Sequence, residues 1–130
     1  MSSYVIEETH GSIKKIEYYW ETVDSTAVID ATATVEIETD FGYNGEILEL
    51  ITEPGSGLYA PDDNYDVVML DEDLHDVLCG AGADRSSTVT EYVQPTSLGV
   101  VANDKLKLQV SNHGGDVGDV RNGTVTVFIR

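Results

Sequence analysis

The chain has 130 residues, is 41% hydrophobic, and carries 24 acidic against 7 basic side chains, a formal net charge of −17. This length suits a single domain (1–130) with its own core, and the apolar content is that of a folded chain rather than a disordered one. The charge excludes DNA or RNA as a direct partner and disfavours an anionic membrane surface, because both need clustered Lys and Arg.

The charge is unevenly distributed along the chain. Residues 1–80 contain 19 acids and only two bases, Lys14 and Lys15, whereas residues 81–130 contain five acids and five bases. Two interpretations remain open. The difference is chance variation within one solvated domain, or the neutral segment contacts a partner while the acidic part faces solvent.

One cysteine, Cys79, rules out an intrachain disulfide and is consistent with a reducing compartment. The first residues lack the basic region and apolar core of a secretory signal. No apolar run approaches the ~20 residues of a membrane helix. We therefore expect no membrane association.

Alternation of polar and apolar residues predicts strands in the first third of the chain. Tyr4–His10 and Ile13–Thr22 predict a hairpin around Gly11. Ala27–Phe41 has apolar residues at most odd positions and Asp, Thr or Glu at even ones, which indicates one long strand, or two with a bend, buried on one face. Asn44–Gly45 is a strong hairpin signal, because both residues tolerate positive φ.

Further strands are expected after this turn. Ser86–Val93 fits either a strand or a helix, and no amphipathic helix is evident elsewhere. The other expected strands are Ile47–Thr52, Tyr65–Leu70, His75–Leu78, Lys105–Ser111 and Gly123–Arg130.

About eight strands with frequent turns predict an all-β fold, an antiparallel β-sandwich (jelly-roll-like) or a barrel. We expect its core to consist of apolar residues in the alternating segments. These are Ile16, Tyr18, Trp20, Ile29, Val35, Ile37, Val67, Leu106, Leu108 and Val110.

The acidic stretch at 62–76 is the first candidate for chemistry. Its oxygen-bearing side chains belong to Asp62, Asp63, Asn64, Asp66, Asp71, Glu72, Asp73 and Asp76. Ca²⁺ takes six to eight oxygens, but the spacing does not match the EF-hand loop. His10, His75 and His113 lack Cys partners at zinc-ligand spacing. We expect two polar turns here, with no metal and no cofactor.

Catalysis and sugar binding have weaker signals. Ser86–Ser87 follows a Gly-rich stretch but is not a G-x-S-x-G elbow, and no two carboxylates stand out as a glycosidase pair. No catalytic residue is therefore predicted, and the chain is expected not to be an enzyme. Six aromatic residues fit either a sugar-binding face or core packing. Tyr18 and Trp20 share a strand face with Ile16, and this favours core packing. The six are Tyr18, Tyr19, Trp20, Tyr43, Tyr59 and Tyr92.

Several segments together resemble a family of small β-rich structural proteins encoded among the head genes of tailed bacteriophages, the capsid cement or decoration proteins. They are Thr52–Gly55, Ala60–Val67, Leu70–Asp73, Asp76–Leu78, Gly80–Ser86 and Gly123–Arg130. The chain departs from the family at Leu74, where glycine is usual after the Asp-x-Asp turn.

The resemblance implies a virion protein, made in the host cytoplasm, that binds the outer surface of the major capsid protein and stabilises the head. It also implies a homo-oligomer, a trimer or dimer around a local symmetry axis. The capsid contacts are expected largely within residues 81–130, including the loops Gly80–Ser87 and Asn112–Asn122. The alternatives are another virion component (neck, tail or fibre base) or a carbohydrate-binding module.

Overall fold

The computed structural model describes residues 3–22, 34–115 and 119–130. These residues form nine strands and two short 3-10 turns, at Gly57–Tyr59 and Pro95–Ser97. The predicted all-β fold is confirmed. The strands are β1 (Tyr4–His10), β2 (Ile13–Glu21), β3 (Val35–Glu38), β4 (Tyr43–Pro54), β5 (Asp66–Leu70), β6 (Glu91–Val93), β7 (Val100–Asp104), β8 (Lys107–Ser111) and β9 (Asn122–Ile129).

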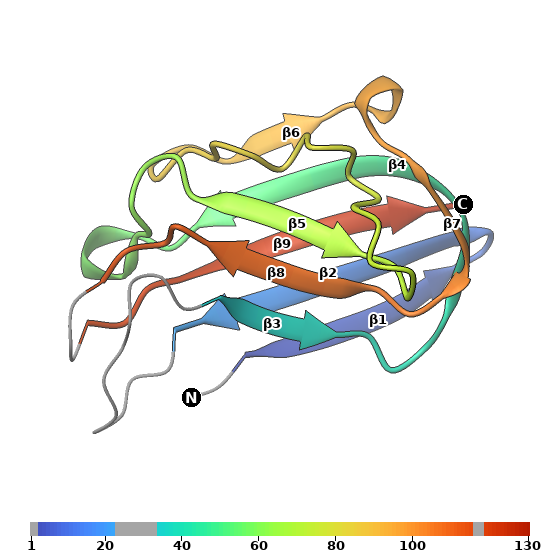
Figure 1. Cartoon of the computed structure of the whole chain (residues 1–130), viewed down its shortest axis with the longest axis horizontal. Helices are drawn as coiled ribbons and strands as arrows, with labels where there is room; N and C mark the ends of the chain where they lie inside the picture. The colour runs from blue at the N-terminus through green and yellow to red at the C-terminus, as the bar shows by residue number, and fades with distance from the viewer. Residues whose placement is uncertain (1–2, 23–33, 116–118) are drawn as a thin grey trace.

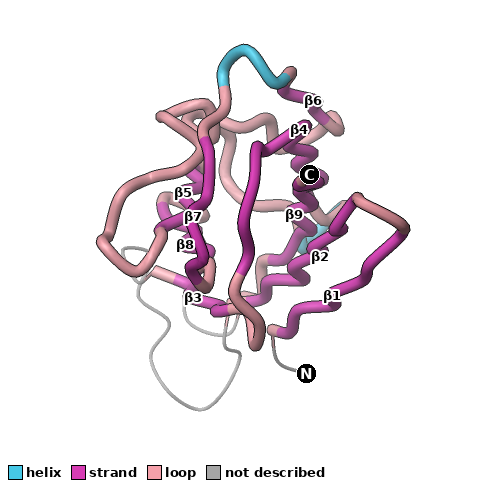
Figure 2. Tube along the Cα trace, turned by 90° about the vertical axis from the view of Figure 1, so that its right-hand side faces the viewer, coloured by secondary structure: helices cyan, strands magenta, loops and turns pink. Residues whose placement is uncertain are grey.

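The strands form two antiparallel sheets that face each other (Figures 1 and 2). The larger sheet has the order β1-β2-β9-β4-β6, and β7 pairs with the first part of β4. The smaller has the order β3-β8-β5. Neighbours in the sheets are mostly distant in the sequence, because β9 lies between β2 and β4, and β8 lies between β3 and β5.

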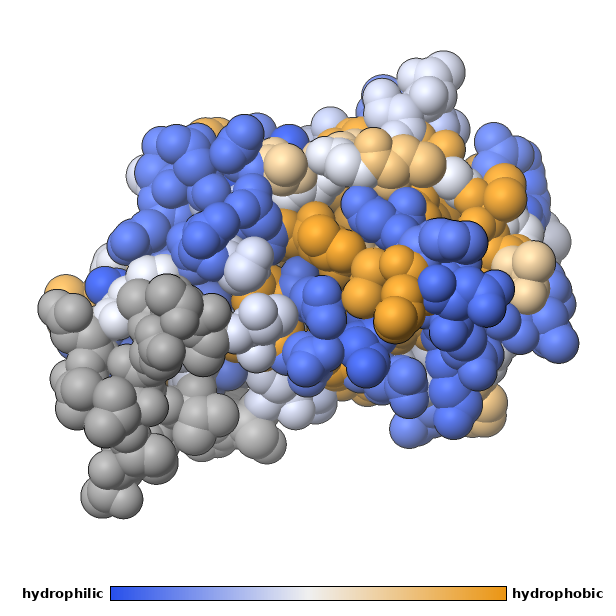
Figure 3. Space-filling model, in the orientation of Figure 1, coloured by the Kyte–Doolittle hydropathy of each residue, from blue (hydrophilic) through white to orange (hydrophobic). Residues whose placement is uncertain are grey.

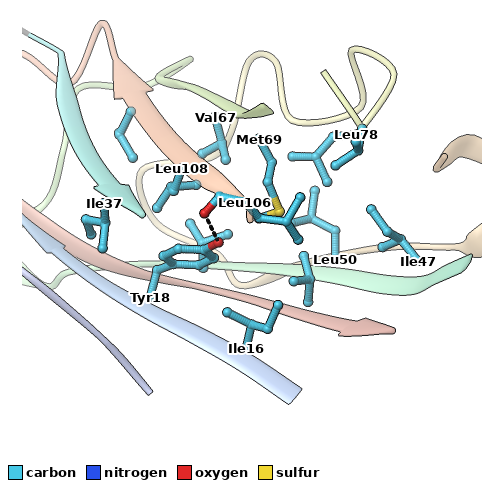
Figure 4. Packing of buried hydrophobic residues seen from close by; sticks show 14 of the residues in the cluster. Ile16, Tyr18, Ile37, Ile47, Leu50, Val67, Met69, Leu78, Leu106 and Leu108 are labelled. Carbon is cyan, nitrogen blue, oxygen red and sulfur yellow. Dashed lines mark hydrogen bonds between the residues drawn. The ribbon is translucent and has the colours of Figure 1, made fainter. Parts of the chain in front are cut away.

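The core lies between the two sheets and contains most of the residues expected there. Val35 is only partly buried, and Ile29 is outside the described residues. Tyr18 reaches across from β2, and its hydroxyl donates a hydrogen bond of 3.1 Å to the Leu106 carbonyl before β8 (Figure 4). The predicted core residues found buried are Ile16, Tyr18, Trp20, Ile37, Val67, Leu106, Leu108 and Val110.

The hairpin predicted at Asn44–Gly45 is wrong. Both residues lie inside β4, where the pairing with β7 shifts register between Tyr43 and Asn44. Gly45 has φ +129, and a Cβ there would come within 2.6 Å of the Arg130 carbonyl oxygen. The glycine thus permits a close approach of two backbones rather than a turn.

The structure corrects or narrows the prediction for four further segments. His75–Leu78 is not a strand, because its backbone turns instead and only an isolated Leu70–Asp76 bridge forms. No helix forms over Ser86–Val93, whose last three residues are β6. Strand β7 was not expected, since it buries only one of its two valines well, Val101. The prediction over Ala27–Phe41 retains only β3, and its first part lies outside the described residues.

Candidate functional site

Carboxylates of the acidic stretch at 62–76 accept hydrogen bonds from nearby backbone N–H groups. The Asp76 carboxylate accepts hydrogen bonds from the backbone N–H groups of Met69 (3.1 Å), Leu78 (3.0 Å) and Gly80 (2.9 Å). Asp71 likewise accepts from the N–H groups of Asp73 and His75, both at 2.9 Å. These carboxylates satisfy donors in turns that lack ladder partners, the role Asp commonly has in loops.

Other acids of the stretch tie separate segments together. Asp63 accepts from Ser87 N–H at 3.1 Å, and Asp66 from Asp84 N–H at 2.9 Å. Glu72 accepts from Lys105 N–H at 3.1 Å. In the described part of the chain, no three His, Cys, Asp or Glu side chains gather in a way that could hold a metal ion. What the carboxylates do here is hold loops in place.

Leu74 adopts a backbone conformation that suits glycine. Its φ is +65, and its side chain is 70% exposed. The turn therefore has the backbone geometry that a glycine would favour, although a leucine occupies it.

Ser86 is bound into a local turn. Its hydroxyl accepts from the backbone N–H groups of Thr88 (3.2 Å) and Val89 (3.1 Å), and its own N–H donates to Glu91 at 2.6 Å. A serine nucleophile would instead need a base within hydrogen-bond reach of its hydroxyl. The arrangement is that of a turn-stabilising residue.

The aromatic residues divide into core and surface groups. Tyr18, Trp20 and Tyr43 are buried, so they do not contribute to a sugar-binding face. Burial raises the pKa of Tyr18 well above its usual value, with a smaller contribution from the Glu7 charge. Tyr59 and Tyr92 are exposed but lie on different segments, the first 3-10 turn and β6.

Glu7 organises an open pocket at the free side of β1. It pairs with Ile16, so its side chain is on the core-facing side of the sheet. Its carboxylate accepts from the Tyr43 hydroxyl (2.7 Å) and from the N–H groups of Asp40 (3.0 Å) and Phe41 (3.2 Å). Burial, followed by the hydrogen bond to Glu7, raises the pKa of Tyr43 far above its usual value.

The pocket has a volume of about 300 Å³. Lys14 provides a cationic group in its wall, and Phe41, whose side chain is 65% exposed, provides an apolar one. The sequence interpretation did not identify this site. The signal was present, since pairing across the predicted Gly11 hairpin places an acid, Glu7, opposite the apolar Ile16. The lining residues are Glu7, Thr9, Lys14, Phe41, Gly42, Tyr43 and Asn44.

The outward face of the smaller sheet carries an apolar patch at its centre. The outward side chains of β5 include Val68 and Leu70, both half-buried. Figure 3 shows hydrophobic surface in the middle of this face, with hydrophilic surface beside and below it. The outward side chains of the neighbouring β8 are polar, namely Lys107, Gln109 and Ser111. An apolar centre with a polar rim is the usual composition of a protein–protein contact.

The two loops predicted to contact a partner both adjoin β5. Gly80–Ser87 runs beside it, with Val67 N–H donating to the Gly82 carbonyl (2.8 Å) and Arg85 N–H to the Tyr65 carbonyl (2.7 Å). In Asn112–Asn122, the Asn112 side chain donates to the Asp66 carboxylate, while residues 116–118 lie outside the description. The neutral segment 81–130 as a whole does not form one face, because β8 and β9 are interior strands of the two sheets.

Comparisons with known proteins found no relative. No protein-family model, no curated protein and no solved structure matches the chain. Among the helices that the structure describes, none has the length and apolar character needed to cross a membrane.

Proposed function

We propose that this protein is a capsid cement or decoration protein that binds the outer surface of a phage major capsid protein and stabilises the head. It acts as a structural component of the virion after synthesis in the host cytoplasm, and it turns over no substrate. It assembles as a trimer or dimer around a local symmetry axis of the capsid.

One observation carries the proposal: β5 presents Val68 and Leu70 between two loops that are hydrogen-bonded to it. The side chains at the centre are apolar and the surroundings are polar, as the surface in Figure 3 shows. A flat face of this kind suits contact with another protein better than enclosure of a small molecule.

Capsid binding of this kind needs only weak individual contacts. Packaged DNA presses outward on the shell, so a protein that bridges capsomers adds contacts that expansion must break. Each contact needs to contribute only ~1 kcal/mol, because many copies act together as linked sites do. The high net negative charge keeps the free protein dispersed before assembly.

The first test is particle stability. Heads stripped of the protein, or assembled without it, are expected to release DNA at lower temperature than complete heads, and added protein should restore the release temperature of complete heads. Leu70→Glu should lower occupancy of the capsid, because it places a charge in the apolar centre. Leu58→Glu is the matched control, since Leu58 is 87% exposed on the first 3-10 turn.

Copy number and glycan binding distinguish the alternatives. Hundreds of copies per virion support a cement protein, and so does a major capsid gene beside the gene for this chain. About a dozen copies or fewer, with stripped heads as stable as complete ones, would indicate a neck, tail or fibre-base component. Specific retention on a glycan array would indicate a carbohydrate-binding module.

A further inference from the structure

Strand β1 leaves one side of its backbone unpaired. It is the end strand of the larger sheet and, within the described residues, pairs with β2 alone. All seven of its residues are in unbroken register with β2, from Tyr4 opposite Tyr19 to His10 opposite Ile13. In an antiparallel pair, every second residue directs its N–H and C=O away from the partner strand. Figure 2 shows β1 at the outer end of its sheet.

The other edges in the described structure are short or covered. β3, β6 and β7 have four, three and five residues, fewer than the seven of β1. The free side of β5 is covered by the loop after it, whose Val77 N–H donates to the Met69 carbonyl at 2.8 Å and whose Gly82 accepts from Val67 N–H. Proteins usually protect edges in these ways, or with Lys, Pro or a bulge. β1 contains no Lys and no Pro, and exposes Tyr4 (46%) and Ile6 (43%).

Both faces beside β1 offer contacts for an added strand. On the core-facing side, Glu7 and Thr9 line the pocket of about 300 Å³ that also contains the exposed Phe41 ring. On the outward side, Tyr4 stacks on Tyr19 with ring centroids 5.1 Å apart, beside Ile6. Alternate side chains of an added strand would therefore lie against Phe41 on one face and against Tyr4 and Ile6 on the other.

The charged residues on and beside β1 determine which kind of strand can pair with it. A second copy that paired all seven residues antiparallel would place Glu7 opposite its own counterpart. Sliding each copy one residue further would place Glu8 opposite Glu8. Like charges directly opposite each other destabilise a sheet, and both copies carry a net charge of −17. On the outward face the acids Glu8 and Glu17 outnumber the single base Lys15, which lies opposite Glu8 and 3.9 Å from the Glu17 carboxylate, so the remaining negative charge favours a basic strand.

We propose that β1 is a docking edge that takes up an extended, Lys- or Arg-bearing segment of another protein as an additional strand. The segment alternates: its outward side chains are basic, opposite Glu8, and its core-facing side chains are apolar, against Phe41. Apolar side chains suit that face because Lys14 already supplies a cation in the pocket. This inference goes beyond the proposed capsid role, since it concerns a different surface and holds whatever assembly the protein serves.

The test uses the full chain and a synthetic peptide of alternating Lys and Val. The peptide should bind, and amide exchange should slow within residues 4–10. N-methylation of the peptide amides that face β1 removes the backbone hydrogen bonds and should weaken binding at least about tenfold. A peptide of the same composition in block order is the control for charge.

Two charge reversals separate docking at β1 from general attraction to an acidic protein. Glu8→Lys should weaken binding at least about tenfold. Glu53→Lys makes the same change of charge at an exposed position on β4 and should weaken it less than about threefold. Equal effects of the two variants, or binding that survives N-methylation, would overturn the proposal. So would a wild-type dimer that Ile6→Pro abolishes, because the occupant would then be a second copy.

Discussion

At the residue scale, single carboxylates replace missing backbone partners. Glu7 and Asp76 each accept three hydrogen bonds, Glu7 from the start of β4 and the turn before it, and Asp76 from β5 and the turns after it. A donor left without its acceptor in a buried place costs about 1–3 kcal/mol. Many of the acidic residues therefore have structural roles in addition to their charge.

Glu7→Ala should lower the free energy of unfolding by about 1–2 kcal/mol, chiefly because it leaves the part-buried Tyr43 hydroxyl without its acceptor, whereas water can reach the exposed N–H groups of Asp40 and Phe41. Urea unfolding measures the change. Glu8→Ala, at the next position of β1, is the control and should change stability by less than about 0.5 kcal/mol. Equal effects would contradict the role of Glu7.

The buried tyrosines predict a loss of stability at high pH. Burial raises the pKa of Tyr65 to about 12 and that of Tyr18 well above its usual value. An unfolded tyrosine ionises near pH 10. Above about pH 10 the unfolded chain therefore loses protons that the folded one keeps, and the free energy of unfolding falls by about 1.4 kcal/mol per pH unit for each group. For Tyr65 this window ends near pH 12.

Urea unfolding from pH 8 to 11.5 measures this slope. Tyr65→Phe should make the alkaline slope shallower by about 1.4 kcal/mol per pH unit. It should change stability near pH 8 little, because the Tyr65 hydroxyl has no hydrogen-bond partner in the residues described. An unchanged slope in this variant would contradict the assignment.

At the scale of elements, strand β4 connects three neighbours. One edge pairs with β9 and the other with β7 and then β6, and irregularities occur between Tyr43 and Asn44 and between Ile47 and Glu49. Bulges bend a strand and increase its twist, which lets a sheet curl. Gly45 lies at the first of these irregularities, in close contact with the end of β9.

Gly45→Ala should lower the free energy of unfolding by about 2–4 kcal/mol, because the new Cβ would meet the Arg130 carbonyl at 2.6 Å and φ is +129. Gly11→Ala is the matched control in the β1–β2 turn. It also has positive φ, but its Cβ would meet nothing within 4 Å, so only the backbone cost of about 1–2 kcal/mol applies. Chemical unfolding of both variants measures the difference.

At the scale of the whole molecule, a net charge of −17 accompanies a core that lies between the two sheets. The acids at 62–76 bond to backbone donors, and those described do not converge on a common point. Repulsion among these carboxylates lowers the free energy of unfolding. Salt largely screens the repulsion between exposed charges that are more than about 10 Å apart. Folding therefore depends on the packing between the two sheets.

EDTA and excess Ca²⁺ should leave the thermal midpoint unchanged within about 5 °C, because no set of carboxylates among the residues that the structure describes is arranged to hold a cation. Thermal melts at constant ionic strength, with excess Mg²⁺ as the comparison, measure this. A larger upward shift with Ca²⁺ alone would indicate a metal site, since a ligand that binds only the folded state raises stability by mass action.

The sequence by itself determined the fold class and most of the core. Alternation along β2 and β8 placed Ile16, Tyr18, Leu108 and Val110 correctly, because in a strand the side-chain period of two assigns each residue to a face. The hairpin of β1 and β2 followed from the same pattern, because its pairing is local. The polar turns around the acidic stretch were also expected.

Only the tertiary structure decided how the strands were ordered and which side chains met. β9 inserts between β2 and β4, which brings Arg130 against Gly45 although the two residues are far apart in the sequence. The glycine is needed for this close approach, and the Asn-Gly pair does not form a turn. The pocket at Glu7 arises in the same way, from β1 and the turn before β4. Local periodicity specifies which face of a strand is buried, but pairing between distant strands depends on the packing of the whole core.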